Sequence, residues 1–177
     1  MTLSTAGLTA DDLTVLFRDC FAMTEATVLV GGASEPFFQP GNPSQIHFRE
    51  DYVRSALHEV AHWCVAGRRR RQLADYGYWY SPDGRDAGQQ QAFFAVEARP
   101  QAIEWFFCEA IGIPFSPSVD NVGAQIEPQQ SRRFEGRIQE WCDQFERTGL
   151  PPRAARFVTA LQSISPVAPE PVPDIAA

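Results

Sequence analysis

The chain has 177 residues, which suits a single domain, since domains commonly contain roughly 100–200 residues. Its hydrophobic fraction of 44% can build a core and excludes a globally disordered protein. The formal net charge of −7 argues against direct nucleic-acid binding, because phosphate contacts need clustered cations.

The sequence shows neither a membrane span nor a secretory leader. No stretch approaches the roughly 18 apolar residues that cross a bilayer, and residues 1–7 lack a basic start and an apolar run. We therefore expect a cytoplasmic protein without membrane contact, whose thiols stay reduced. None of the four cysteines forms a CxxC pair, which excludes a zinc ribbon, and Cys64 and Cys108 are expected to be buried packing residues.

The first third of the chain predicts two helices and two strands. Thr9 is expected to cap a helix whose apolar face contains Leu13, Leu16, Phe17 and Phe21. Strands are predicted at residues 27–30 and 45–49, with a loop at residues 36–44 between them. A second helix is predicted from Tyr52 to about Ala66, capped by Asp51 and ended by Gly67.

The rest of the chain predicts a strand and three helices. The aromatic segment from Tyr76 is expected to be a strand that ends in a Pro-Asp-Gly turn before Asp86. A helix is predicted at residues 89–111, where Pro100 should kink or interrupt it near Val96. Two more helices are predicted at residues 129–147 and 152–163.

This element order predicts an α+β fold with helices around a small sheet, in one compact domain over residues 1–164. Residues 165–177 contain four prolines and are expected to form a disordered tail.

The motif His58-Glu59-Val60-Ala61-His62 predicts a metal site. Residues four apart on a helix project side by side, so His58 and His62 can occupy adjacent positions on one ion. A third ligand is needed. Glu97 is the preferred candidate, because it lies on a polar seam of an otherwise apolar helix, where a buried carboxylate is costly unless it binds a cation. Glu104 on the same seam and His47 are the alternatives.

Two histidines and one carboxylate support two chemistries. With zinc, a metal-bound water would be deprotonated by Glu59, which gives a peptidase. With ferrous iron, three open positions would serve dioxygen and substrate, which gives an oxygenase. The HExxH spacing alone favours the peptidase, although Arg68 stands where the metzincin pattern requires a third histidine. A metal-stabilised binding module without turnover is a third hypothesis.

A family resemblance decides between them. The sequence resembles the bacterial elongation factor P hydroxylases over roughly residues 10–163. The segments that carry the resemblance are Ala56–Cys64, Tyr76–Tyr80, Pro82–Asp86, Val96-Glu97, Pro100–Ala102, Asp120-Asn121 and Pro151–Phe157.

The resemblance implies iron-dependent hydroxylation of the β-lysyl-modified lysine of elongation factor P. It implies an Fe(II) ion held by His58, His62 and Glu97, dioxygen as cosubstrate, and an α+β core related to HExxH metalloproteases. No residue pattern specifies the reductant. Glu59 is then a candidate catalytic residue that relays a proton or orients an oxygen species on the metal, with a purely structural role beside the ligands as the alternative.

The substrate would present two amines, so acidic residues near the metal are expected to bind it. The candidates are Asp75, Asp83, Asp86 and Asp120, with Tyr78 along the aliphatic stem of the lysine. Asp83 and Asp86 have an alternative role in stabilising a turn. The run Arg68–Arg71 is either a solvated helix end or a basic patch that docks an acidic partner.

Overall fold

The computed structural model describes residues 8–78, 86–119 and 127–165. Helix α1 (Ala10–Glu25) begins as predicted, because Thr9 and Asp12 form a reciprocal capping box. Leu13, Phe17 and Phe21 are buried on one face of this helix. The left-handed Ala26 then ends α1 and turns the chain into the sheet.

A three-stranded sheet follows, with strand order β1-β3-β2. Strand β1 (Thr27–Ala33) runs parallel to β3 (Ser44–Arg49), and β2 (Phe37–Gln39) pairs antiparallel with β3 at the edge. The two predicted strands are confirmed. The prediction of an unbroken loop at residues 36–44 is wrong, because it contains β2.

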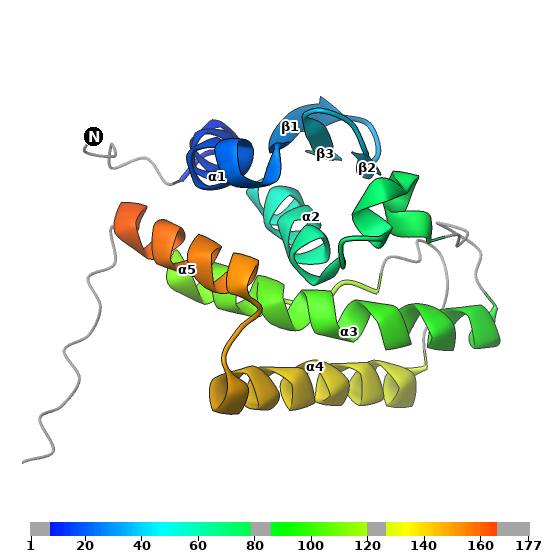
Figure 1. Cartoon of the computed structure of the whole chain (residues 1–177). Coiled ribbons are helices and arrows are strands. Elements are labelled where there is room, and N and C mark those ends of the chain that lie inside the picture. The colour runs from blue at the N-terminus through cyan, green and yellow to red at the C-terminus, as the bar shows by residue number, and fades with distance from the viewer. Residues whose placement is uncertain (1–7, 79–85, 120–126, 166–177) are drawn as a thin grey trace, which may run out of the picture.

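Helix α2 (Val53–Val65) carries the HExxH motif and lies between the sheet and α3 (Figure 1). The predicted cap by Asp51 is wrong, since Tyr52 is the N-cap and makes no side-chain capping bond. Helix α3 (Ala87–Ala110) runs unbroken through Pro100, so Pro100 does not interrupt it, and the alternative of a kink near Val96 stays a prediction.

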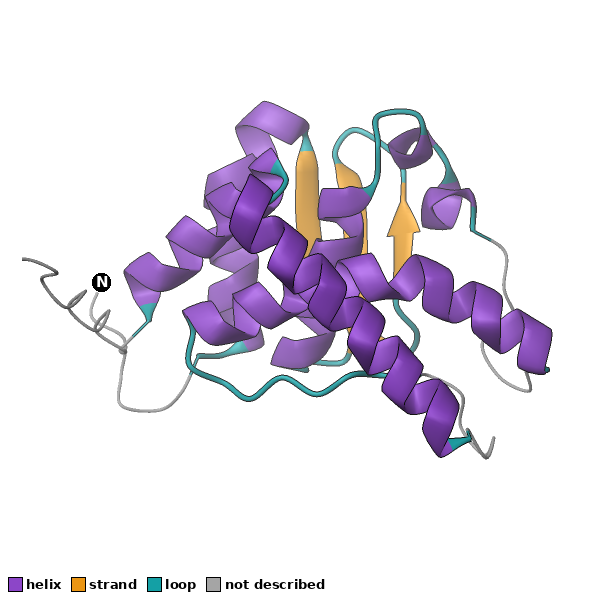
Figure 2. Cartoon of the chain, turned by 90° about the horizontal axis from the view of Figure 1, so that it is seen from below, coloured by secondary structure: helices purple, strands orange, loops and turns teal. Residues whose placement is uncertain are grey.

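Helix α4 (Pro128–Thr148) packs on α3 on the side away from α2, and α5 (Pro152–Ile164) returns across α3 to contact α1 and α2. Figure 2 shows the helices crossing in front of the three strands. The predicted strand from Tyr76 is wrong where the structure describes it. The 3₁₀ helix Ala74–Gly77 lies there instead, and another short 3₁₀ helix, Arg70–Gln72, precedes it.

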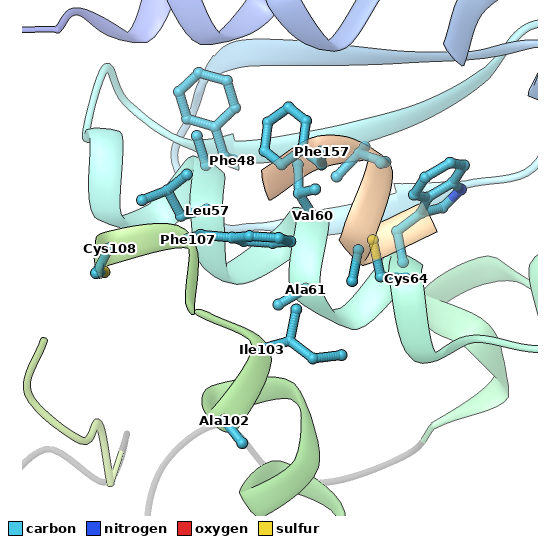
Figure 3. Close-up of a cluster of buried hydrophobic side chains, with 14 of the residues drawn as sticks. Phe48, Leu57, Val60, Ala61, Cys64, Ala102, Ile103, Phe107, Cys108 and Phe157 are labelled. Atoms are coloured by element: carbon cyan, nitrogen blue, oxygen red, sulfur yellow. The ribbon is translucent and has the colours of Figure 1, made fainter. Parts of the chain in front are cut away.

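One core joins the layers. Figure 3 shows Leu57, Val60 and Ala61 of α2 packed between Phe48 of β3 and side chains of α3 and α5. Cys64 and Cys108 are free and buried in the same core, as predicted. Since α2 is anchored on its apolar positions, its polar face is fixed in direction.

Five α-helices and one small sheet in the described parts of the chain confirm the α+β prediction. None of the described helices is long and apolar enough to cross a membrane. The predicted tail lies almost wholly outside the described residues, and the relation of the core to HExxH metalloproteases stays a prediction.

Candidate metal centre

The two motif histidines lie side by side on the polar face of α2. Their side chains are 24% and 12% exposed for His58 and His62, and their ring centroids are 4.7 Å apart. The Nε2 atoms of the two rings are 3.1 Å apart and face the same point. This is the arrangement that the four-residue spacing predicts.

Helix α3 brings Glu97 to that point. The Glu97 side chain is 2% exposed, and its Oε2 lies 3.2 Å from Nε2 of His62 and 3.6 Å from Nε2 of His58. Donors that each lie 2.0–2.2 Å from one ion stand roughly 2.8–3.6 Å apart at angles of about 90–110°. Within the described residues, this is the one group of histidine and acidic side chains whose donor atoms converge in this way. The three residues therefore fit a single metal ion.

The charges at the site also call for a cation. Burial by itself would raise the pKa of Glu97, yet the charge and hydrogen bond of His62 and the charge of His58 lower it to about 2. Burial would lower the pKa of His58, but the hydrogen bond to Glu104 and nearby carboxylates raise it to about 10. Without a metal, a proton on His58 offsets the carboxylates. A divalent ion would take over that role and release the proton.

Glu104, the alternative third ligand, lies on the other side of His58. Its Oε2 is 2.9 Å from Nδ1 of His58, the ring nitrogen that faces away from Glu97. Its Oε1 accepts hydrogen bonds from Nε and Nη2 of Arg54, at 2.9 and 2.7 Å. The geometry thus places Glu104 behind a ligand and Glu97 among the donor atoms.

The donor atoms open onto a cavity of about 620 Å³. Its wall includes strand β2 with the two residues before it, Glu35 and Pro36. Asp75, Tyr76 and Tyr78 form a second part of the wall, and the polar seam of α3 forms a third. Glu59 also lines this cavity, and burial raises its pKa despite the nearby histidines. The volume suits a small-molecule or side-chain substrate, since ligand pockets commonly measure roughly 300–1,000 Å³.

Comparisons with known proteins show the family to which this chain belongs. The family model described as elongation factor P hydroxylase matches residues 16–169. The chain belongs to this family. A relative from Haemophilus influenzae, the elongation factor P lysine hydroxylase, is 39% identical over 155 residues, which cover 85% of this chain and 86% of the relative. The matched range of this family member contains His58, His62, Glu97 and Glu104.

Of the five predicted substrate residues, two line the cavity, one caps a helix and two lie outside the described residues. Asp75 and Tyr78 line the cavity, and Oδ1 of Asp75 accepts the main-chain N–H of Phe38 at 2.8 Å. Asp86 caps α3 by accepting the N–H of Gln89 at 2.8 Å. Asp83 and Asp120 lie outside the described residues.

His47 lies on β3, where its ring stacks on Phe37 at 4.0 Å and its Nε2 pairs with Oε1 of Gln45 at 2.9 Å. It therefore has partners of its own and does not join the converging donor atoms.

The run Arg68–Arg71 divides in two. Arg70 lies 4.3 Å from the ring centre of Tyr78 and donates to the carbonyl of Tyr76, while Arg71 pairs with Glu25. Arg68, Arg69 and Arg70 are all exposed, and only Arg70 of these three contacts the Tyr76–Tyr78 segment. Half of this run therefore supports the walls of the fold, and the docking hypothesis rests on the other half.

Sequence reasoning missed Arg54, which holds Glu104. A signal was present, because Arg54 precedes His58 by four residues and must share its helix face.

Proposed function

We propose that this chain hydroxylates the β-lysyl-modified lysine of elongation factor P, in the cytoplasm, using dioxygen and an Fe(II) ion held by His58, His62 and Glu97. The observation that carries the proposal is the convergence of two imidazoles and one buried carboxylate at a cavity, in a member of the elongation factor P hydroxylase family.

Held by His58, His62 and Glu97, ferrous iron would supply the chemistry that activates dioxygen, because two histidines and one carboxylate leave part of the ion free for other ligands. The chain's own residues supply the rest. His58 and His62 must offer unprotonated Nε2 atoms, and Glu97 must be ionised. Its low pKa meets the last condition.

Glu59 is the candidate for proton transfer. It follows His58 directly, lines the same cavity, and its pKa is raised by burial. A carboxyl group with a raised pKa exchanges protons closer to neutral pH than an exposed one.

Asp75 and Tyr78 are the candidates for holding the substrate. Because Phe38 fixes one oxygen of the Asp75 carboxylate, the group is oriented before a substrate arrives. Its charge would attract an ammonium group, and the Tyr78 ring would pack along the aliphatic stem.

The test is the mass of elongation factor P from cells that lack this protein. We expect the loss of one oxygen atom from the modified lysine, and restoration by the wild-type gene. An unchanged mass would contradict the proposal.

Metal identity needs a second test. The metal-free protein, loaded anaerobically with ferrous iron, should give product only after dioxygen is admitted, whereas zinc should give none, since zinc has no redox chemistry. Activity with zinc, or cleavage of a peptide, would favour the peptidase alternative with Glu59 as general base.

A further inference from the structure

Glu104 has both carboxylate oxygens engaged at the back of the metal centre. Oε2 lies 2.9 Å from Nδ1 of His58, and Oε1 accepts from two nitrogens of Arg54. The side chain is 2% exposed and comes from α3, whereas its two partners come from α2. A buried carboxylate therefore connects a candidate metal ligand to a cation.

This contact determines which nitrogen of His58 faces the metal. A carboxylate accepts hydrogen bonds, so Nδ1 of His58 carries the hydrogen and donates it to Glu104. In the neutral ring, Nε2 then holds the lone pair, and Nε2 is the atom that faces His62 and Glu97. Without Glu104, the other tautomer and other ring rotations would become accessible.

Arg54 is itself fixed on several sides. Its Nη2 donates to the carbonyl of Ser116 at 2.9 Å, its Nη1 donates to that of Pro114 at 3.4 Å, and its guanidinium lies 5.3 Å from the ring centre of Phe115. Arg54 therefore presents a fixed pair of donors to Glu104. Both donors reach Oε1 of Glu104, so Oε2 is left to accept from His58 and the carboxylate has a defined orientation.

We propose that Glu104 is the positioning residue of His58, that Arg54 acts through Glu104, and that this pair sets the affinity of the centre for its metal. The inference rests on the proposed His58, His62 and Glu97 centre, but not on the reaction that this centre performs. Partners of this kind contribute roughly 10–100-fold to metal affinity in other proteins.

Glu104→Gln separates positioning from packing, because it keeps the volume but offers a single acceptor oxygen to two donors. The probe is Co(II), titrated into the metal-free protein and followed by its visible absorption. We expect Co(II) binding about 10–100-fold weaker than in the wild type. The thermal midpoint of the metal-free protein should stay close to that of the wild type. The control is Glu109→Gln, an exposed glutamate on the same helix, which should bind Co(II) as the wild type does.

Arg54→Met tests the second half of the proposal in a double-mutant cycle. Alone it should weaken Co(II) binding, and in the Glu104→Gln background it should add little, since residues of one network are not additive. Wild-type affinity in Glu104→Gln would overturn the proposal, as would a loss of stability without a loss of affinity. Equal effects of Arg54→Met in both backgrounds would overturn the part assigned to Arg54. If the wild type itself failed to bind Co(II), the metal centre and the proposed function would fall instead.

Discussion

Two clusters of charged residues lie along helix α2, and they balance their charge in opposite ways. The metal-side cluster comprises Arg54, His58, His62, Glu97 and Glu104. The arginine cluster surrounds the C-terminal end of the helix and comprises Glu25, Trp63, Arg71 and Arg153.

In the arginine cluster, carbonyl groups, one carboxylate and an indole ring contact the cations, although Nε of Arg71 and Nε of Arg153 are buried without a hydrogen-bond partner among the described residues. Nη2 of Arg153 donates to the carbonyls of Trp63, Cys64 and Ala66, at 2.9, 3.2 and 2.6 Å, where the helix end carries partial negative charge. Both guanidinium groups lie over the Trp63 ring, at 4.6 and 5.6 Å from its centre. Glu25 pairs with Arg71 at 2.6 Å.

In the metal-side cluster, the two carboxylates of Glu97 and Glu104 face one permanent cation, Arg54. Of these two carboxylates, Arg54 contacts that of Glu104, whereas the described neighbours of the Glu97 carboxylate are the two imidazoles and Gln101. A buried carboxylate without a fixed positive partner is costly. The comparison teaches that a buried carboxylate without a permanent cation beside it marks a place for a metal ion, whereas the cations at the C-terminal end of α2 are contacted by carbonyl groups and a carboxylate of the protein.

The largest effect should follow from removing a donor atom of the metal-side cluster. Glu97→Ala should weaken metal binding by more than the roughly 10–100-fold that a supporting residue contributes to the affinity. The variant should therefore give no product. Metal content after gel filtration measures this. Full occupancy in Glu97→Ala, together with loss in Glu104→Ala, would reverse the assignment of the third ligand.

Glu59→Gln should change the rate without changing the metal. We expect hydroxylation slower by about 10²–10⁴-fold if Glu59 transfers protons, with the iron content unchanged. Product formed per iron in a single turnover, with oxygen uptake followed in parallel, checks this. Turnover at the wild-type rate would remove Glu59 from the catalytic residues and leave the metal ligands in place.

Arg153→Met should affect stability instead of metal binding. It leaves three carbonyls at the end of α2 without their charged donor, so the free energy of unfolding should fall by about 1.5–3 kcal/mol. Urea denaturation of the metal-free protein measures it. Arg137→Met, at an exposed position of α4, is the control and should change stability by about 0.5 kcal/mol or less. A drop in Co(II) affinity equal to that of Glu104→Gln would show that the two clusters are not independent.

His47→Gln should have the smallest effect. The substitution removes the stacking on Phe37, which is worth about 0.2–1 kcal/mol in cross-strand pairs, and leaves the donor atoms untouched. Co(II) affinity should equal that of the wild type. Weaker binding would make His47 a member of the metal-side cluster after all.

The parts of this site that are local in sequence could be predicted from it. The spacing of His58 and His62 fixes their common direction, because both stand on one helix whose apolar residues set its orientation. The seam of α3 gave two carboxylates, Glu97 and Glu104. Which of them reaches the donor atoms depends on where α3 crosses α2, and no local pattern contains that crossing.

The segments whose structure was predicted wrongly are those held by residues far away in the sequence. Strand β2 has three residues next to Pro36, Pro40 and Gly41, and it forms only because β3 pairs with it. Tyr76 follows a strand-like pattern, but its φ is +57°, and its ring stacks on Phe38 at 4.4 Å. Aromatic residues rarely adopt that backbone region, so tertiary packing overrides local preference here.

The bond between Asp75 and the N–H of Phe38 has a consequence for how a substrate can enter. Phe38 is the middle residue of edge strand β2, and an edge strand is where an incoming extended chain would pair through its main chain. Asp75 already occupies this N–H, so strand addition would have to displace a carboxylate. A peptidase that grips an extended backbone would need this edge open. The closed edge instead favours a folded partner that stays outside and inserts one long side chain toward the metal.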